Sequence, residues 1–298
     1  MLRLFLSIPT DLRANRLARD AFVCLFVFLF SVQAGAEQSA GSWRPLPWHL
    51  VDYNYTLPDT GPFNTLEMDM EIKGNAKKGM FLYLSPLWGR LDQTGFYFGL
   101  QTDIFDKGRS LGKGLIFSRW GKGRHSDGRA GPDGWSFIGE KATSGEGDFV
   151  SIRTSYGWKP GRYTFLLKTR KAGVEDSNGI WVDLLIHEQA TGKWIDGGGL
   201  RFPGSRPHLR KRVVSFVEIY HANKRPLLDV PPNLNGLSIF FSPPRVNSSH
   251  RPTRSRASFY PKVPRRVKVS EGAGGVSLTI QTENVVRGKR GPSDDRLD

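Results

Sequence analysis

Residues 65–73 read Thr65-Leu66-Glu67-Met68-Asp69-Met70-Glu71-Ile72-Lys73, a strict alternation of apolar and charged side chains. Successive side chains of a β-strand point to opposite faces, so this period of two predicts a strand with one buried and one solvent-facing side. Gly74–Lys78 is typical of a turn, and Met80–Leu84 is predicted to be the returning strand. The segment therefore favours antiparallel sheet over helix.

The same pattern recurs along the chain about every 8–15 residues. Turn chemistry is plentiful between the strand-like segments, because the chain has 34 glycines and 19 prolines. This regular spacing predicts an all-β protein, built as an antiparallel β-sandwich or jelly roll. The further predicted strands are Phe96–Leu100, Gly114–Trp120, Phe149–Ser155, Tyr163–Lys168, Ile180–His187, Lys193–Ile195, Val213–Tyr220 and Leu237–Phe241.

The stretch Gly95–Asp103 alternates aromatic residues with glycines and ends on polar groups. Glycine inside a strand marks a place where a neighbouring group approaches the backbone closely. We therefore expect Gly95 and Gly99 to make room for a neighbour, and the aromatic residues to lie in the core. Gln101 and Asp103 are expected to be presented where the strand leaves the sheet.

The N-terminal 36 residues have the form of an export signal. Four arginines precede the apolar run 21–30, and Ala34-Gly35-Ala36 fits an A-x-A cleavage pattern. The run is shorter than the roughly 20 residues that span a bilayer, so no transmembrane span is expected in the mature form, although an uncleaved anchor stays open. The predicted organisation is a signal peptide over 1–36, an arm over 37–62, a β-sandwich over 63–242 and a disordered basic tail over 243–298.

Composition narrows the chemistry and the partners. Cys24, the only cysteine, lies inside the apolar run, so the mature chain is expected to lack disulfides, thiolate nucleophiles and cysteine-bound zinc. The net charge is +15, and nearly half of this excess falls in residues 243–298. On an exported protein this tail favours contact with anionic cell-surface polymer or lipid headgroups over nucleic acid. The alternative is a solvated tail with no specific partner.

Five motifs in order resemble those of the domain-of-unknown-function family 3472. They are Tyr97-Phe98-Gly99-Leu100-Gln101, Phe117-Ser118-Arg119-Trp120, the segment Gly157–Tyr163, Thr191-Gly192-Lys193-Trp194 and Ser215-Phe216-Val217-Glu218. The resemblance covers roughly Phe63 to Tyr220 and implies a β-rich, lectin-like domain of secreted or cell-envelope proteins, with no established activity. After Tyr220 the chain departs from the pattern and becomes basic and rich in proline.

Glu67, Asp69 and Glu71 are the candidate catalytic residues. They share one face of the predicted strand, with successive Cα atoms roughly 6.6 Å apart. Two carboxylates with a third between them suit a retaining glycoside hydrolase. The string resembles that of laminarinase and lichenase enzymes, which implies Glu67 as nucleophile, Asp69 as its modulator and Glu71 as acid/base. The favoured alternative is the solvent face of an edge strand, where acids repel unwanted pairing.

A second set of residues is predicted to bind a ligand without catalysis. Trp88 and Trp135 lie next to glycines, where an indole ring could stack on a sugar. The predicted polar companions, at or near strand ends, are Gln101, Asp103, Arg119 and Glu218.

No metal site is expected. Asp183 and His187 share a strand face, but no second histidine stands at ligand spacing. Calcium is a weaker alternative in the glycine-rich loops, which carry carboxylates at Asp103, Asp106, Asp127 and Asp133.

The favoured function is therefore an exported, carbohydrate-binding or surface-associated β-sandwich, secreted or held at the cell envelope, without a required cofactor. A retaining glycoside hydrolase and a structural envelope protein with a polymer-binding tail are the alternatives. The expectation leans away from an enzyme, and the sequence predicts no oligomeric state.

Overall fold

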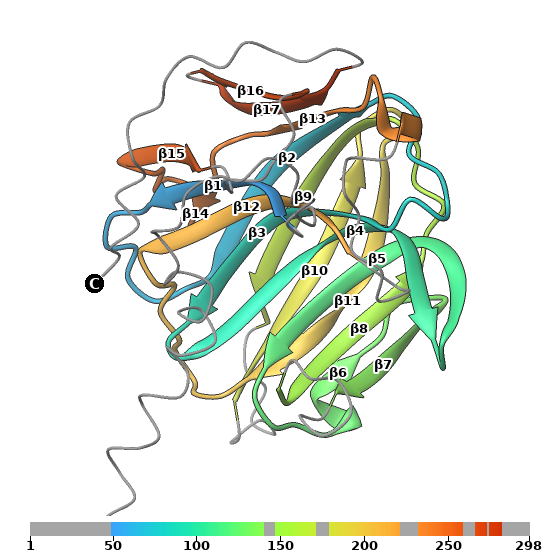
Figure 1. Cartoon of the computed structure of the whole chain (residues 1–298). Helices are drawn as coiled ribbons and strands as arrows, with labels where there is room; N and C mark the ends of the chain where they lie inside the picture. Colours follow the sequence, from blue (N-terminus) through green and yellow to red (C-terminus); the bar gives the residue numbers. More distant parts are fainter. Residues whose placement is uncertain are drawn as a thin grey trace, which may run out of the picture. The chain divides into compact units, whose positions relative to one another are not determined.

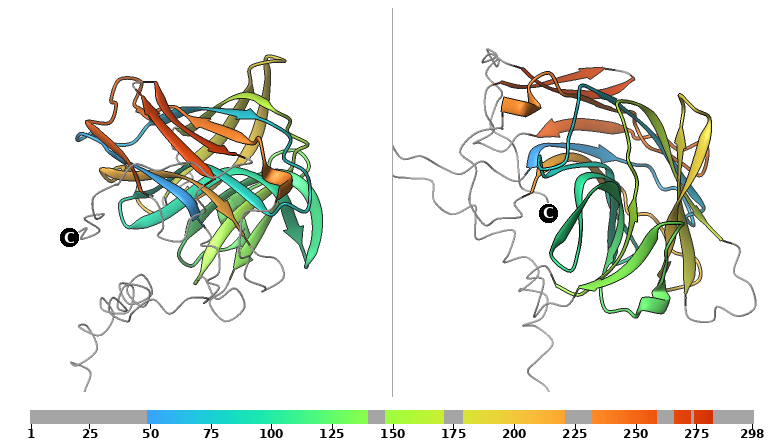
Figure 2. Two further views of the ribbon diagram at one scale, coloured as in Figure 1. Left: turned by 45° about the horizontal axis from the view of Figure 1, so that its top comes forward. Right: turned by 90° about the vertical axis from the view of Figure 1, so that its right-hand side faces the viewer.

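Two antiparallel sheets stack face to face in the part of the chain that the structure describes (Figures 1 and 2). The structure is a computed structural model that describes residues 49–139, 147–170, 179–220, 232–258, 266–272 and 274–281. These residues form strands and two short 3-10 helices, η1 (His125–Asp127) and η2 (Pro232–Leu234), and contain no α-helix. The predicted all-β antiparallel sandwich is confirmed.

The first sheet has eight strands. The hairpin partners β3, β4 and β5 lie at its centre, and β12 and β1, which are far apart in the sequence, extend it on one side. In spatial order the strands are β15 (Arg254–Ser258), β1 (His49–Thr56), β12 (Arg212–Ile219), β3 (Leu82–Leu91), β4 (Thr94–Asp106), β5 (Arg109–Trp120), β8 (Phe149–Ser155) and β7 (Gly134–Gly139).

The second sheet has nine strands, and β2 with its strict alternation lies near its middle. The order is β16 (Val267–Gly272), β17 (Gly275–Ile280), β13 (Ser238–Phe241), β2 (Thr65–Lys73), β9 (Gly161–Thr169), β10 (Ile180–Glu188), β11 (Lys193–Phe202) and β6 (Gly128–Arg129). The short strand β14 (Arg245–Val246) also pairs with β2.

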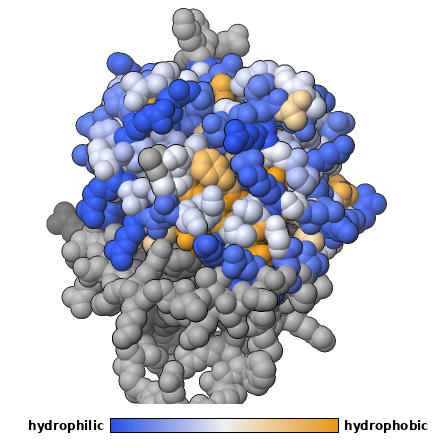
Figure 3. All heavy atoms as spheres, turned by 90° about the horizontal axis from the view of Figure 1, so that it is seen from above, coloured by the Kyte–Doolittle hydropathy of each residue, from blue (hydrophilic) through white to orange (hydrophobic). Residues whose placement is uncertain are grey.

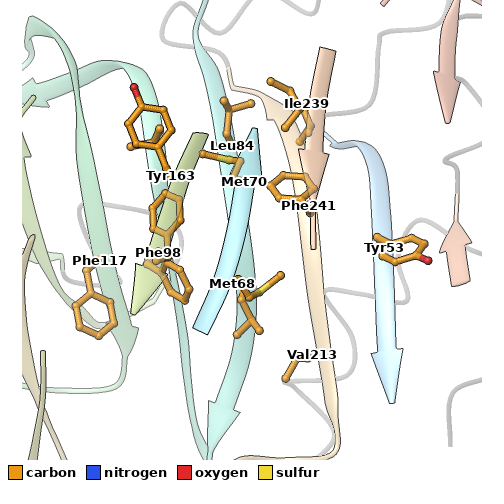
Figure 4. Packing of buried hydrophobic residues seen from close by; sticks show 14 of the residues in the cluster. Tyr53, Met68, Met70, Leu84, Phe98, Phe117, Tyr163, Val213, Ile239 and Phe241 are labelled. Atoms are coloured by element: carbon orange, nitrogen blue, oxygen red, sulfur yellow. The ribbon is translucent and has the colours of Figure 1, made fainter. Parts of the chain in front are cut away.

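The core lies between the sheets and is built from the apolar half of each alternating strand. Met68 and Met70 of β2 point into it, as do Leu84 and Phe98 of the first sheet (Figure 4). The Phe98 and Phe165 rings meet across the interface with centroids 5.8 Å apart. Aromatic pairs of this kind contribute about 0.5–1.5 kcal/mol beyond the apolar area that they bury.

Gly95 and Gly99 have the role that the sequence predicted. A β-carbon at Gly99 would collide with the carbonyl oxygen of Leu84, where β3 bulges against β4. A β-carbon at Gly95 would lie 2.7 Å from the indole ring of Trp120. Both positions therefore need glycine because a neighbour occupies the space of a side chain.

The sandwich extends beyond the predicted bounds of 63–242. Strand β1 falls in the predicted arm, and β14 to β17 fall in the predicted tail. Val276, Leu278 and Ile280 of β17 are each at most 3% exposed and belong to the core. Residues 276–280 alternate weakly in the sequence, but the basic and proline-rich composition around them led to their assignment to the tail. Residues 282–298 and the predicted signal peptide lie outside the described residues.

Polar side chains dominate the surface seen from above the view of Figure 1, with a small apolar area near its centre (Figure 3). This follows from the charged half of the alternating strands, which faces away from the core. Within the described ranges, no helix has the length and apolar character needed to cross a membrane.

The C-terminal strand gives a direct test of its place in the core. Leu278→Ala is expected to lower the free energy of unfolding by about 2–5 kcal/mol, because it removes a fully buried side chain. The neighbouring Ser277→Ala faces outward and is expected to stay within about 0.5 kcal/mol. Urea denaturation followed by tryptophan fluorescence measures both. Equal midpoints for Leu278→Ala and the unmodified protein would show that the segment does not belong to the core.

Candidate functional site

The three candidate catalytic carboxylates lie on the outer face of β2, because Met68 and Met70 between them face the core. Glu67 accepts a hydrogen bond from Arg245. Asp69 Oδ1 accepts one from the Thr164 hydroxyl at 2.6 Å. Glu71 Oε1 lies 3.5 Å from both Arg162 Nε and Lys73 Nζ. These are contacts of a polar strand face, and the hydrolase assignment stays a prediction.

Asp103 is buried, although the sequence placed it at an open strand end. It is 1% exposed, and its carboxylate accepts hydrogen bonds from the backbone N–H of Gly79 (2.8 Å) and Phe81 (3.3 Å). The hydroxyls of Thr102 and Ser110 donate to it as well, each at 2.9 Å. The carboxylate therefore ties the turn before β3 to β4 and β5.

Arg119 is also buried, at 4% exposure, on the core side of β5. Its Nη2 lies 3.4 Å from the carboxylate of Asp127, which also accepts hydrogen bonds from Arg201 and from the backbone of Arg124. Burial disfavours the charge of Asp127, but these donors outweigh it and lower the pKa of Asp127. Through this contact with Asp127, Arg119 holds η1 against the core side of β5.

The other four predicted ligand residues lie on the outer face of the first sheet. Glu218, Tyr83 and Gln101 are direct cross-strand neighbours on β12, β3 and β4, so their side chains form one row. Trp88 lies five residues after Tyr83 on β3, beyond the bulge, and its cross-strand neighbour on β4 is Tyr97. Trp135 lies apart from them on the edge strand β7, opposite Arg153.

A continuous path of rings crosses this face, and we call it the aromatic face: His49, Tyr83, Trp88, Tyr97, Trp120 and Phe216. His49 stacks on Phe216 at 4.4 Å, and Phe216 meets Tyr83 at 5.2 Å. Tyr83 meets Tyr97 at 5.8 Å, and Tyr97 meets Trp120 at 4.9 Å. Trp88 completes the path at 6.3 Å from Trp120. Five neighbouring strands, β1, β12, β3, β4 and β5, thus contribute to one surface.

Sequence reasoning missed most of the aromatic face. It assigned the aromatic residues of 95–103 to the core, which holds for Phe96 and Phe98, while Tyr97 between them faces outward and is half-buried. The period of two that identified the strand also separates these two faces. The sequence does not show which strands lie beside β4, and these strands supply other rings of the aromatic face.

Tyr83 is the unusual member of the aromatic face. It is 3% exposed, and its hydroxyl has no hydrogen-bond partner among the described residues. The nearby Ser85 hydroxyl donates instead to the carbonyl of Phe98 at 3.1 Å. Burial, with smaller contributions from Tyr97 and Glu218, raises the pKa of Tyr83 well above 10, so the phenol stays protonated. An unpartnered buried hydroxyl costs about 1–3 kcal/mol.

At the end of the same row, His49 is the cross-strand neighbour of Glu218. Its Nδ1 lies 2.7 Å from Asp52 Oδ1. Burial alone would lower the pKa of His49, but the hydrogen bond with Asp52 and the negative charges of Asp52 and Glu218 outweigh it and raise that pKa.

Asp183, considered above for metal binding, is bound by arginines. Arg170 Nε and Nη2 donate to its two oxygens at 2.6 and 2.5 Å, and Arg129 Nη2 donates at 3.1 Å. Arg129 also holds Asp196 with two hydrogen bonds of 2.7 and 2.9 Å. Among the described residues no cluster of three or more His, Cys, Asp or Glu could hold a metal ion. Calcium binding stays a prediction.

No family model and no curated protein matches the chain. Two solved structures each align with 77% of this chain and 98% of their own. One is a Scytalido-glutamic peptidase with a peptide-based transition-state analogue, at 8% identity and a TM-score of 0.42. The other is SCP-B, a member of the eqolisin family of peptidases, with the tripeptide Ala-Ile-His, at 9% identity and a TM-score of 0.37. Neither alignment bears on activity, and the resemblance to family 3472 stays a prediction.

The buried carboxylate of Asp103 is expected to stabilise the fold rather than bind a ligand. Asp103→Ala leaves two backbone N–H groups and two hydroxyls without their acceptor, so we expect a loss of at least about 3 kcal/mol in the free energy of unfolding. Asp106→Ala, at the end of the same strand, is the control and is expected to change it by less than about 0.5 kcal/mol. A stable Asp103→Ala protein in urea denaturation would contradict this role.

The Arg129–Asp196 pair predicts a pH dependence. The hydrogen bonds from Arg129 lower the pKa of Asp196 below its usual 3.8. The stability contributed by this pair is therefore complete above about pH 3.8 and is lost as the pH falls through the folded-state pKa. Asp196→Asn should reduce the urea midpoint at about pH 6 and have a smaller effect at about pH 3. An equal reduction at both pH values would argue against the pair as the cause.

Proposed function

We propose that this protein is an exported carbohydrate-binding β-sandwich whose ligand lies on the aromatic face. The observation that carries the proposal is the Tyr83 hydroxyl, which is buried and lacks a hydrogen-bond partner among the described residues. Glu218 and Gln101 flank it in the same cross-strand row. A sugar hydroxyl can donate and accept at once, so it can hydrogen-bond to the Tyr83 hydroxyl and also to a neighbouring group of the row.

The surroundings of Tyr83 suit a sugar ring. The half-buried rings of Trp88 and Tyr97 offer aromatic surface for the C–H face of a pyranose. Few, well-placed polar groups among aromatic side chains are typical of small-molecule sites. The proposed ligand is therefore a glycan with a sugar ring that stacks on Trp88 and Tyr97.

The alternative hydrolase would use a different sheet. Glu67 and Glu71 each lie within ion-pair distance of a cation on the second sheet, so the binding proposal does not involve them. Contact of the basic C-terminal residues with anionic polymer also stays a prediction.

Tyr83→Phe tests the proposal with the smallest change. It removes one hydroxyl, and we expect affinity for the glycan to fall about threefold to tenfold, the effect of one hydrogen bond. In the absence of ligand, stability should be unchanged or higher, because the lost hydroxyl is unpartnered in the folded protein. A glycan array identifies the ligand, isothermal titration measures the affinity, and urea denaturation measures the stability.

Trp88→Ala should weaken the same binding about tenfold or more through loss of the stacking surface. Arg90→Ala on the same strand has an exposed side chain and serves as the control. Absence of binding to every glycan on the array would contradict the proposed function. A destabilised Tyr83→Phe protein with unchanged affinity would assign the hydroxyl to the fold instead.

A further inference from the structure

A second row of side chains crosses the outer face of the other sheet. Asp69, Thr164, His187 and Trp194 are successive cross-strand neighbours on β2, β9, β10 and β11. They face outward because the residues beside them, such as Met70, Phe165 and Ile186, are buried in the core. Three strand spacings of about 4.8 Å give the row a length of roughly 14 Å. We call it the Trp194 row.

Trp194 provides an open aromatic surface at the end of this row. It is 52% exposed, and among the described residues it is the one large apolar side chain that is exposed to solvent. The indole stacks on the His187 ring, with centroids 4.8 Å apart and planes 22° from parallel. One side of the indole is thus held against the imidazole, and the exposed remainder can accept a flat partner.

The turn between β10 and β11 holds Trp194 in place. Glu188 accepts hydrogen bonds from the backbone N–H of Gly192 at 2.9 Å and from the Thr191 hydroxyl at 2.8 Å. The Thr191 hydroxyl in turn accepts the backbone N–H of Lys193 at 3.3 Å. The Thr191-Gly192-Lys193-Trp194 motif, which the aromatic face does not use, is therefore a fixed support for the indole. A surface that is ordered before binding loses less entropy when a ligand binds.

The remainder of the row is a chain of hydrogen bonds. Gln189 Nε2 donates to Thr164 Oγ1 at 3.0 Å, and Thr164 Oγ1 donates to Asp69 Oδ1 at 2.6 Å. Gln189 and Asp69 keep further acceptor capacity, because an amide and a carboxylate each have several sites. The row therefore offers one stacking surface followed by donors and acceptors along a line.

Two carboxylates beside the row are already paired with cations of the protein. Glu67 pairs with Arg245, and Glu71 lies near Arg162 and Lys73. An anionic or cationic polymer would have to break these pairs, whereas a neutral ligand leaves them in place. A stable protein partner would require a larger apolar patch than one indole and two half-buried leucines, Leu166 and Leu185.

We infer that the Trp194 row is a second carbohydrate-binding site, which takes a short stretch of a neutral, extended oligosaccharide lying across the strands. A pyranose with equatorial hydroxyls stacks its C–H face on Trp194, and the following rings hydrogen-bond to Gln189, Thr164 and Asp69. This site stands independently of the aromatic face, which lies on the other sheet.

The test uses the full-length protein with cellohexaose, xylohexaose and N-acetylchitohexaose as probes. Trp194→Ala should weaken binding of at least one probe tenfold or more, whereas Trp194→Tyr should retain most of the affinity. Lys168→Ala, an exposed residue of β9 outside the row and its supporting turn, is the control and should bind as the unmodified protein does. In ¹H–¹⁵N spectra, the same probe should shift the indole N–H signal that Trp194→Ala removes. Each measurement is repeated in the Trp88→Ala background, where loss of the aromatic face should leave the Trp194 response intact.

Three outcomes would overturn the inference. All probes could bind Trp194→Ala and the unmodified protein equally. No probe could shift the Trp194 indole signal. Light scattering could show that Trp194→Ala changes the oligomeric state without changing probe binding, which would make the row a contact between protein copies. The two proposals can fail separately. If Tyr83→Phe weakens glycan binding and Trp194→Ala does not, the proposed function stands and this inference falls; the reverse result has the opposite meaning.

Discussion

Packing of aromatic and aliphatic side chains between the two sheets is the constraint on which the rest of the structure depends. Phe98 meets Phe165, and Phe96 meets Phe202, each pair with ring centroids 5.8 Å apart across the interface. Because a strand has only two faces, committing one face of every strand to this interface leaves the other face of each sheet outward. Both candidate binding surfaces are such outer faces.

The outer faces differ because of what their strands carry. On the first sheet, Gly95 lets the Trp120 indole lie close over the backbone of β4, where its ring meets that of Tyr97 at a tilt of 56°. On the second sheet, one exposed indole lies at the end of a row of polar side chains. The first surface is a broad aromatic area around a buried hydroxyl, and the second is a narrow line. Their ligands are therefore expected to be held differently, even if both are glycans.

Much of the fold could be predicted because the alternation is local. Strands Thr65–Lys73 and Phe149–Ser155 were predicted with the bounds that the structure gives. Strands β1 and β15 were not predicted, because their residues belong to segments whose composition is typical of an arm and a tail. They gain their order from pairing with each other and with β12, partners far away in the chain. Backbone pairing over such separations leaves no local signal in the sequence.

Among the candidate site residues, the sequence determined the side-chain types and the face of the strand on which each lies. Glu67, Asp69 and Glu71 share a face, as their spacing required. Tertiary structure alone decided which residues become neighbours. It buried Asp103 among four donors and paired Arg119 with Asp127, because the turn before β3 and the segment around η1 fold onto those positions. It also aligned Glu218, Tyr83 and Gln101 in one row, since strand order and register depend on the whole sheet rather than on any single strand.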